Sequence, residues 1–82
     1  MPVLVPHTKL AALLGEKTMQ SSATTVQELL REAERRVPPA EWAQAMRCII
    51  LVNGRSVHLV DGLRTALQPD DQVWMVFPAS GG

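Results

Sequence analysis

The sequence has a single cysteine, Cys48, and only two histidines. One cysteine cannot form a disulfide within the chain, and two histidines leave no plausible structural zinc site. The fold must therefore be stable without a covalent cross-link or a metal. This cysteine usage favours a reducing, cytoplasmic location.

Long apolar runs and an excess of one charge are also lacking. No run approaches the roughly 20 apolar residues of a membrane span, and the segment Met1 to Pro6 lacks the basic stretch and long apolar core of a signal peptide. Eight Lys and Arg balance eight Asp and Glu, so no net field attracts nucleic acid or an anionic membrane. We expect the chain to be used whole, with neither nucleic acid nor membrane among its partners.

The chain is short, with 82 residues, of which 46% are hydrophobic and 20% charged. This composition is typical of one small folded domain, which has little core to spare for a deep catalytic cavity. No Cys-x-x-Cys, His-Glu-x-x-His or glycine-rich phosphate loop occurs. Length and motifs together favour a carrier or binding module over an enzyme.

Two local signals predict secondary structure clearly. Thr25 and Glu28 match a capping box, with the Glu28 side chain reaching back to the Thr25 amide, and the apolar residues after them recur at helical spacing as far as Val37. A second, short helix can follow, with Pro39 as its first residue. Asn53-Gly54 favours the positive φ angles of a type I′ turn, which predicts a hairpin over residues 48–60.

Weaker signals complete the expected order of elements. We predict a first strand at residues 3–5, a loop or short helical turn over residues 7–15, a return strand within residues 17–22 and a final strand over residues 72–77. One helix then lies between two hairpin units. Its burial favours a mixed sheet that curls around it, with the first and last strands adjacent at the centre. The expected fold is α+β, a ubiquitin-like β-grasp of order ββαβββ over residues 1–77.

Most residues that could carry chemistry have an ordinary structural interpretation. Cys48 begins an apolar strand, where it is expected to be a small packing residue, and His58 is expected to be half-exposed on the hairpin. Asp70 and Asp71 are typical of a turn, because no third oxygen ligand for a metal is nearby in the sequence. None of these residues is proposed to be catalytic.

The C-terminus is different, because Gly81 and Gly82 are the last residues of a short tail, residues 78–82, which has no reason to be ordered. Two glycines make the last peptide units slender, so the carboxylate can thread a narrow channel into the active site of another enzyme. Transfer of AMP from ATP would make that carboxylate an acyl adenylate, and a sulfur donor could displace the AMP to leave a thiocarboxylate. The alternative is that the two glycines occur by coincidence.

The final strand predicts a docking surface. If Val73 and Met75 point at the helix, Trp74 and Val76 lie on the other face as an apolar patch that fits a partner. The alternative is that Trp74 is covered by Trp42 or by the segment from Leu10 to Leu14.

These features carry a family resemblance that covers residues 50–82 well. The stretch contains Val52-Asn53-Gly54, Gly62-Leu63-Arg64-Thr65-Ala66-Leu67, Asp70-Asp71-Gln72-Val73 and Phe77-Pro78-Ala79-Ser80-Gly81-Gly82. It resembles the MoaD/ThiS family of ubiquitin-like sulfur carriers, and most of all the small subunit of molybdopterin synthase. The chain departs from that family at Pro69-Asp70-Asp71, where Asp-Gly-Asp is common, and over residues 7–15.

The resemblance implies a sulfur carrier for molybdopterin biosynthesis that is not itself a catalyst and binds no cofactor. Gly82 would be adenylated by an enzyme similar to the ubiquitin-activating class, which uses the ATP, and then sulfurated by a sulfurtransferase or desulfurase. The acceptor would be an enzyme such as the large subunit of molybdopterin synthase. The implied site residues are Pro78, Ala79, Ser80 and Gly81, which thread the partner's active site, and Trp74, Val76 and Phe77, which dock.

Three alternatives stay open at this stage. The chain could carry sulfur for cysteine, thiamine or a specialised metabolite. It could be a protein modifier whose Gly82 carboxyl forms an isopeptide bond with lysines of its targets. It could also be an interaction domain with no chemistry at its terminus.

Overall fold

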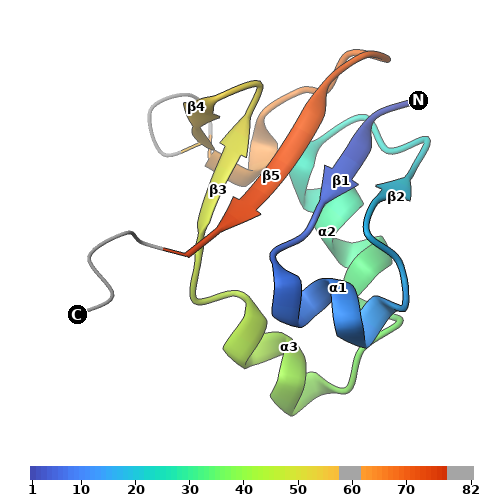
Figure 1. Ribbon diagram of the computed structural model, residues 1–82. Coiled ribbons are helices and arrows are strands. Elements are labelled where there is room, and N and C mark those ends of the chain that lie inside the picture. Colours follow the sequence, from blue (N-terminus) through green and yellow to red (C-terminus); the bar gives the residue numbers. More distant parts are fainter. Residues whose placement is uncertain (58–61, 78–82) are drawn as a thin grey trace.

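The computed structural model describes residues 1–57 and 62–77. Its helices and strands follow the chain from the N-terminus to the last strand (Figure 1). They are β1 (Val3–Val5), α1 (Thr8–Leu14), β2 (Met19–Gln20), α2 (Val26–Glu34), α3 (Pro39–Ala45), β3 (Ile49–Val52), β4 (Arg55–Ser56), the 3₁₀ helix η2 (Gly62–Arg64) and β5 (Gln72–Val76).

The strands form one five-stranded sheet in the order β2-β1-β5-β3-β4. β1 and β5 are parallel neighbours, while the other three pairs are antiparallel. The last strand is therefore central, with α2 behind the sheet in the view of Figure 1 and α1 and α3 below it. This arrangement confirms the predicted α+β fold, a β-grasp in which the first and last strands are adjacent.

The core lies between the inner face of the sheet and α2. Val73 and Met75 of β5 are 0% and 1% exposed, as the alternation in this strand predicted. Burying each such side chain contributes about 1.5–3 kcal/mol, so the sheet and the helix stabilise one another. The buried side chains around them include Leu4, Leu10, Val26, Leu29, Leu30, Ala33, Ile50 and Val52.

The N-terminus of α2 is capped as predicted, with one change. The Thr25 hydroxyl accepts the backbone N–H of Glu28 at 3.2 Å. The Glu28 carboxylate, which the capping box placed on the Thr25 amide, accepts the hydroxyls of Thr24 and Thr25 at 2.9 and 3.4 Å. α2 ends at Glu34, before the predicted end at Val37, and Pro39 begins α3 as expected.

The hairpin between β3 and β4 has the predicted turn. Asn53 and Gly54 both have positive φ angles, 51° and 87°, as a type I′ turn requires. The Asn53 side chain also reaches the start of β5, donating to the Asp71 carboxylate at 2.7 Å and accepting the N–H of Gln72 at 3.0 Å. The second Asp71 oxygen accepts the N–H of Gln68 at 2.8 Å. Asp71 therefore stabilises a turn, which is the ordinary role that the sequence indicated.

Several strands are shorter than predicted. β4 consists of Arg55–Ser56, and Val57 after it is buried at 2% exposure, whereas Arg55 is exposed. Residues 58–60 of the predicted strand lie outside the described residues. The return strand is only Met19–Gln20, since the Ser21 hydroxyl then accepts the N–H of Ala23 at 2.9 Å and donates to the Glu32 carboxylate. β3 begins just after Cys48, and β5 ends just before Phe77.

Residues 7–15, left open as a loop or a short helical turn, contain the helix α1. It buries Leu10 and Leu14 and ends at Gly15, whose φ of 75° is the left-handed conformation of a helix C-cap. No helix among residues 1–57 and 62–77 has the length and hydrophobicity to span a membrane.

Candidate functional site

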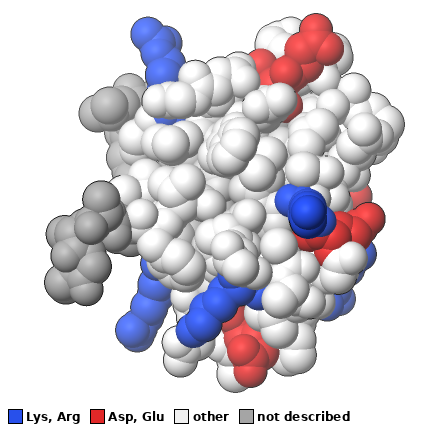
Figure 2. Space-filling view, in the orientation of Figure 1, with Lys and Arg blue, Asp and Glu red and all other residues white. Residues whose placement is uncertain are grey.

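The outer face of β3 and β5 presents a row of apolar side chains, which we call the open face. It consists of Ile49, Leu51, Trp74 and Val76, and Phe77 follows at its lower end. Register places Leu51 opposite Trp74 and Ile49 opposite Val76, so the side chains of each pair lie together on the same side of the sheet. Figure 2 shows that the surface over these two strands is uncharged, with the charged residues toward the rim.

Trp74 projects from the centre of this face. Its side chain is 42% exposed, and the indole Nε1–H donates to the Gln72 side chain at 3.1 Å. Trp42 is buried and lines a pocket with Leu30 of α2 and Leu63. Trp74 therefore stays open to solvent, and the alternative that Trp42 or the segment after Leu10 covers it is wrong.

Phe77 is 48% exposed and packs against His7, with 4.2 Å between the ring centroids and a 30° angle between the ring planes. His7 precedes α1 and is itself 7% exposed. The end of the open face thus adjoins the junction between β1 and α1. An exposed apolar row that contains a tryptophan suits docking to a protein, because a few side chains, with Trp common among them, supply most of the binding energy at protein interfaces.

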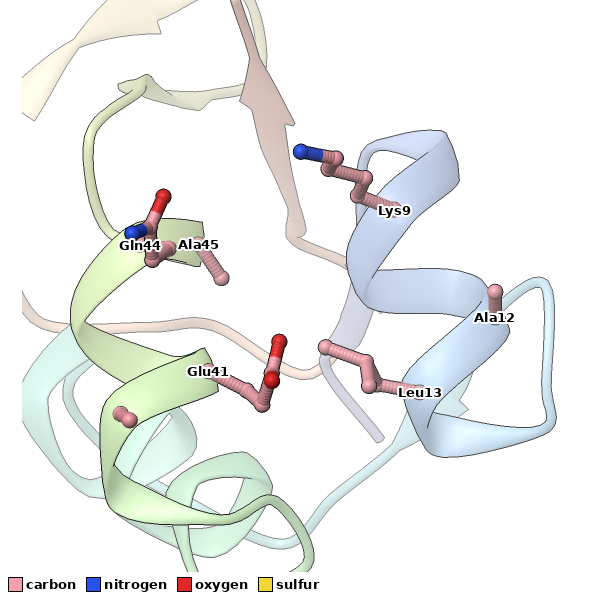
Figure 3. Close-up of a pocket in the computed structure, with 7 residues that line it drawn as sticks. Lys9, Ala12, Leu13, Glu41, Gln44 and Ala45 are labelled. Carbon is pink, nitrogen blue, oxygen red and sulfur yellow. The ribbon is translucent and has the colours of Figure 1, made fainter.

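A groove of about 320 Å³ lies between α1 and α3, below the sheet. Leu13 and Glu41 point toward one another across it (Figure 3), and Lys9, Ala12, Ala40, Gln44 and Ala45 complete its lining. Its wall is mostly apolar, and Lys9, Glu41 and Gln44 are its polar side chains. No pattern in the sequence predicted this groove, because it forms only where the two helices lie side by side.

The described part of the chain has no arrangement typical of catalysis. No group of three or more His, Cys, Asp or Glu side chains that could hold a metal occurs within residues 1–57 and 62–77. Burial raises the pKa of the Cys48 thiol, which disfavours the nucleophilic thiolate. Cys48 is half-buried and packs against the core, as the sequence indicated for a packing residue.

Some predicted residues lie outside the described residues. They are His58 on the hairpin and the tail residues Pro78, Ala79, Ser80, Gly81 and Gly82. The structure brings together the other three predicted site residues, Trp74, Val76 and Phe77, at the end of the central strand. Their roles in docking remain predictions.

Sequence reasoning missed three residues of this region. Ile49 and Leu51 extend the open face, and alternation in the predicted hairpin could have found them, because Ile50 and Val52 face the core. His7 had no such signal. Its contact with Phe77 joins opposite ends of the sequence, and histidine is not among the residues favoured at helix N-caps.

Solved structures share the fold over almost the whole chain. The small archaeal modifier protein 1 (SAMP1) from Methanosarcina acetivorans has a TM-score of 0.77 at 21% identity, covering 99% of this chain and 95% of that one. A chain of the BexX/CysO complex from Amycolatopsis orientalis has a TM-score of 0.79 at 21% identity, and the match covers 100% of this chain and 100% of that one. The HVO 2177 protein from Haloferax volcanii gives 0.72 at 26% identity, covering 99% and 85%.

Comparison with curated protein sequences gave no match. The family model of the ThiS family, in contrast, matches residues 7–82, which is nearly the entire chain. That match includes the helix α1, which the sequence resemblance had not covered, as well as the central strand and the terminal glycines. The chain therefore belongs to the ThiS family.

Proposed function

We propose that this protein is a sulfur carrier whose reactive group is the carboxylate of Gly82. An activating enzyme of the ubiquitin-activating type would bind the ATP. The carboxylate attacks the α-phosphate, which forms the acyl adenylate and releases pyrophosphate. The persulfide of a sulfurtransferase or desulfurase then attacks the acyl carbon and expels AMP, which leaves an acyl disulfide. A thiol cleaves that disulfide to give the thiocarboxylate, which passes its sulfur to a substrate held by an acceptor enzyme.

Membership of the ThiS family over residues 7–82 is the observation that carries this proposal. The position of β5 supports it, because the tail follows directly from a central strand whose outer side presents Trp74 and Val76. A partner that covers the open face would hold the domain beside its own active site. The reactive end would then be tethered at high local concentration. In this role the chain is a co-substrate and does not catalyse a step itself.

Among acceptors, we propose the large subunit of molybdopterin synthase first. The segment from Phe77 to Gly82, which resembles the small subunit of that enzyme, supports this choice. Acceptors in cysteine, thiamine or specialised-metabolite biosynthesis use the same carrier chemistry and are the alternatives. The fold shared with a chain of the BexX/CysO complex is compatible with each of them.

A protein modifier is the second candidate function. It is favoured by the fold shared with a protein whose name is small archaeal modifier protein 1. The adenylation step would be the same, but a lysine amine of a target would then become bonded to the Gly82 carbonyl carbon. The two functions differ in the atom that the terminus finally bonds, which is a sulfur in the carrier and a target nitrogen in the modifier.

The deciding experiment is the intact mass of the protein isolated from its host. We expect a species in which one sulfur has replaced one oxygen, mapped by fragmentation to Gly82. The same species should form from purified protein, ATP, a sulfur source and the host's activating enzyme. Unmodified mass in both preparations would overturn the carrier proposal. Ladders of tagged targets in the lysate would then support the modifier.

Co-purification tests the choice of acceptor. The tagged protein should recover the large subunit of molybdopterin synthase from host extract. Recovery of a cysteine synthase or a thiazole synthase in its place would move the assignment to that pathway. The sulfur-carrier chemistry at Gly82 would be unaffected by such a result.

A further inference from the structure

His7 lies where the end of the central strand, the start of α1 and the end of α3 meet. The ring Nδ1 accepts the backbone N–H of Leu10 at 3.2 Å, which caps α1. The ring Nε2 is 2.9 Å from the backbone oxygen of Ala45 at the end of α3. These two bonds together require the tautomer with its proton on Nε2, because one nitrogen must accept while the other donates.

The two bonds fix both the position and the orientation of the imidazole. The side chain is also 7% exposed, so surrounding atoms leave it little freedom to rotate. A short polar side chain could cap α1 equally well, but the imidazole also spans from the Leu10 N–H to the Ala45 oxygen. Held by these two bonds, the ring is placed for a contact with another ring.

That contact is with Phe77. The ring centroids are 4.2 Å apart and the planes are tilted by 30°, while Phe77 remains 48% exposed. Phe77 is the first residue after β5 and directly precedes Pro78. A residue before proline is restricted to extended conformations, so the placement of Phe77 restricts the direction in which the chain continues.

We infer that His7 is a positioning residue for the C-terminal tail, acting through Phe77. This inference rests on the proposed function. A tail that must enter a partner's channel loses conformational freedom on docking. That loss is smaller if Phe77, the residue before the tail, is already held in place. His7 does not touch the reacting atoms. It orients the residue from which the reactive arm departs.

A double-mutant cycle measures the effect. His7→Asn keeps a side-chain acceptor for the Leu10 N–H but removes the ring, and Phe77→Leu keeps an apolar side chain but removes the other ring. Each single variant should raise the KM of the carrier for the activating enzyme about three- to tenfold, the strength of one aromatic pair, with kcat nearly unchanged. The effects of the two single variants should combine to less than their product in the double variant, because both changes remove the same ring contact.

Gln27→Ala, at an exposed position of α2 that lies outside the open face, is the control and should keep the wild-type KM. Melting curves of every variant separate docking from stability, and Phe77→Leu keeps the test valid if His7→Asn folds poorly. Multiplicative effects in the double variant would overturn the inference. So would a wild-type KM for both single variants.

NMR of the isolated protein separates this inference from the proposed function. Cross-peaks between the ring protons of His7 and Phe77 should be present in the wild type. The amides of residues 79 and 80 should become more mobile on the nanosecond scale in His7→Asn. If these results hold but no activating enzyme adenylates the wild type, the proposed function is overturned while the anchoring of Phe77 stands. If the wild type is adenylated but the amides of residues 79 and 80 are equally mobile in the wild type and in His7→Asn, the positioning role is overturned.

Discussion

At the scale of single residues, Cys48 shows how burial controls chemistry. The thiol lies beside an apolar cavity of about 330 Å³ lined by Met46, Ile50, Val57, Gly62 and Leu63. Burial raises its pKa from an ordinary value of 9.0, because the thiolate is poorly solvated there. At neutral pH the thiol is therefore protonated, which makes it a packing group and a weak nucleophile.

Alkylation of Cys48 tests this assignment. The folded protein should react with iodoacetamide several-fold more slowly at pH 8 than the chain unfolded in urea, since less thiolate is present. The favourable contribution of the buried thiol to stability is complete below pH 9.0 and is lost as the pH rises through the raised pKa. Reaction rates are followed by intact mass, with glutathione as the reference thiol. Equal rates for folded and unfolded chains would contradict the raised pKa.

Deletion of Gly82 tests the proposed reactive group. Removing this one residue should abolish adenylation and sulfur transfer, because the carboxylate can no longer reach the site where it reacts. The melting temperature should stay within a degree or two, about the effect of a change that removes no core contact. Ser80→Ala, which keeps both terminal glycines, is the control and should remain active. Sulfur transfer by the truncated protein would exclude Gly82 as the acyl site.

At the scale of elements, the start of α2 depends on one hydroxyl. Thr25→Ala removes the acceptor of the Glu28 N–H and should lower the free energy of unfolding by about 1 kcal/mol. Gln27→Ala, at an exposed position of the same helix, is the control and should change it by less than about 0.5 kcal/mol. Urea denaturation followed by circular dichroism measures both. A smaller loss for Thr25→Ala than for Gln27→Ala would show that the cap contributes nothing.

The elements that the sequence predicted well are those with local causes. Thr25 caps α2, Pro39 begins α3, and Asn53-Gly54 forms the turn between β3 and β4, each through contacts within a few residues. α1 could not be predicted as firmly, because its cap is His7, which is held by the distant Ala45 carbonyl. The length of β2 was overestimated, because the Ser21 hydroxyl bonds to the Ala23 N–H and the Glu32 carboxylate where the strand ends.

At the scale of the whole molecule, the two faces of the sheet have different roles. The inner face packs in the core and stabilises the fold, and the open face is the one predicted to bind a partner. Trp74 and Met75 are neighbours in β5 but are 42% and 1% exposed. Met75→Ala should lower the free energy of unfolding by about 2–5 kcal/mol, because it leaves a cavity in the core. Trp74→Ala should change stability much less and weaken binding to the activating or acceptor enzyme about tenfold or more, as expected for a large aromatic side chain at an interface.

Titration calorimetry beside a melting curve checks this pair of variants. Each variant serves as the control for the other, since both shorten a side chain of the same strand. Wild-type affinity in Trp74→Ala would remove the open face from the docking surface. Alternation alone predicted that Trp74 and Val76 face outward, whereas the contact of Phe77 with His7 required the complete fold.

The strand order also sets when the domain can fold during its synthesis. β5 is made after the other four strands, yet it alone joins β1 to β3. Until it leaves the ribosome, the two halves of the sheet share no edge, so the domain cannot assemble and its nascent segments stay open to proteases. A chain that terminates early would lack both the fold and the slender end. The complete sheet is therefore expected to form only after residues 72–76 have been synthesised, because that strand joins its two halves.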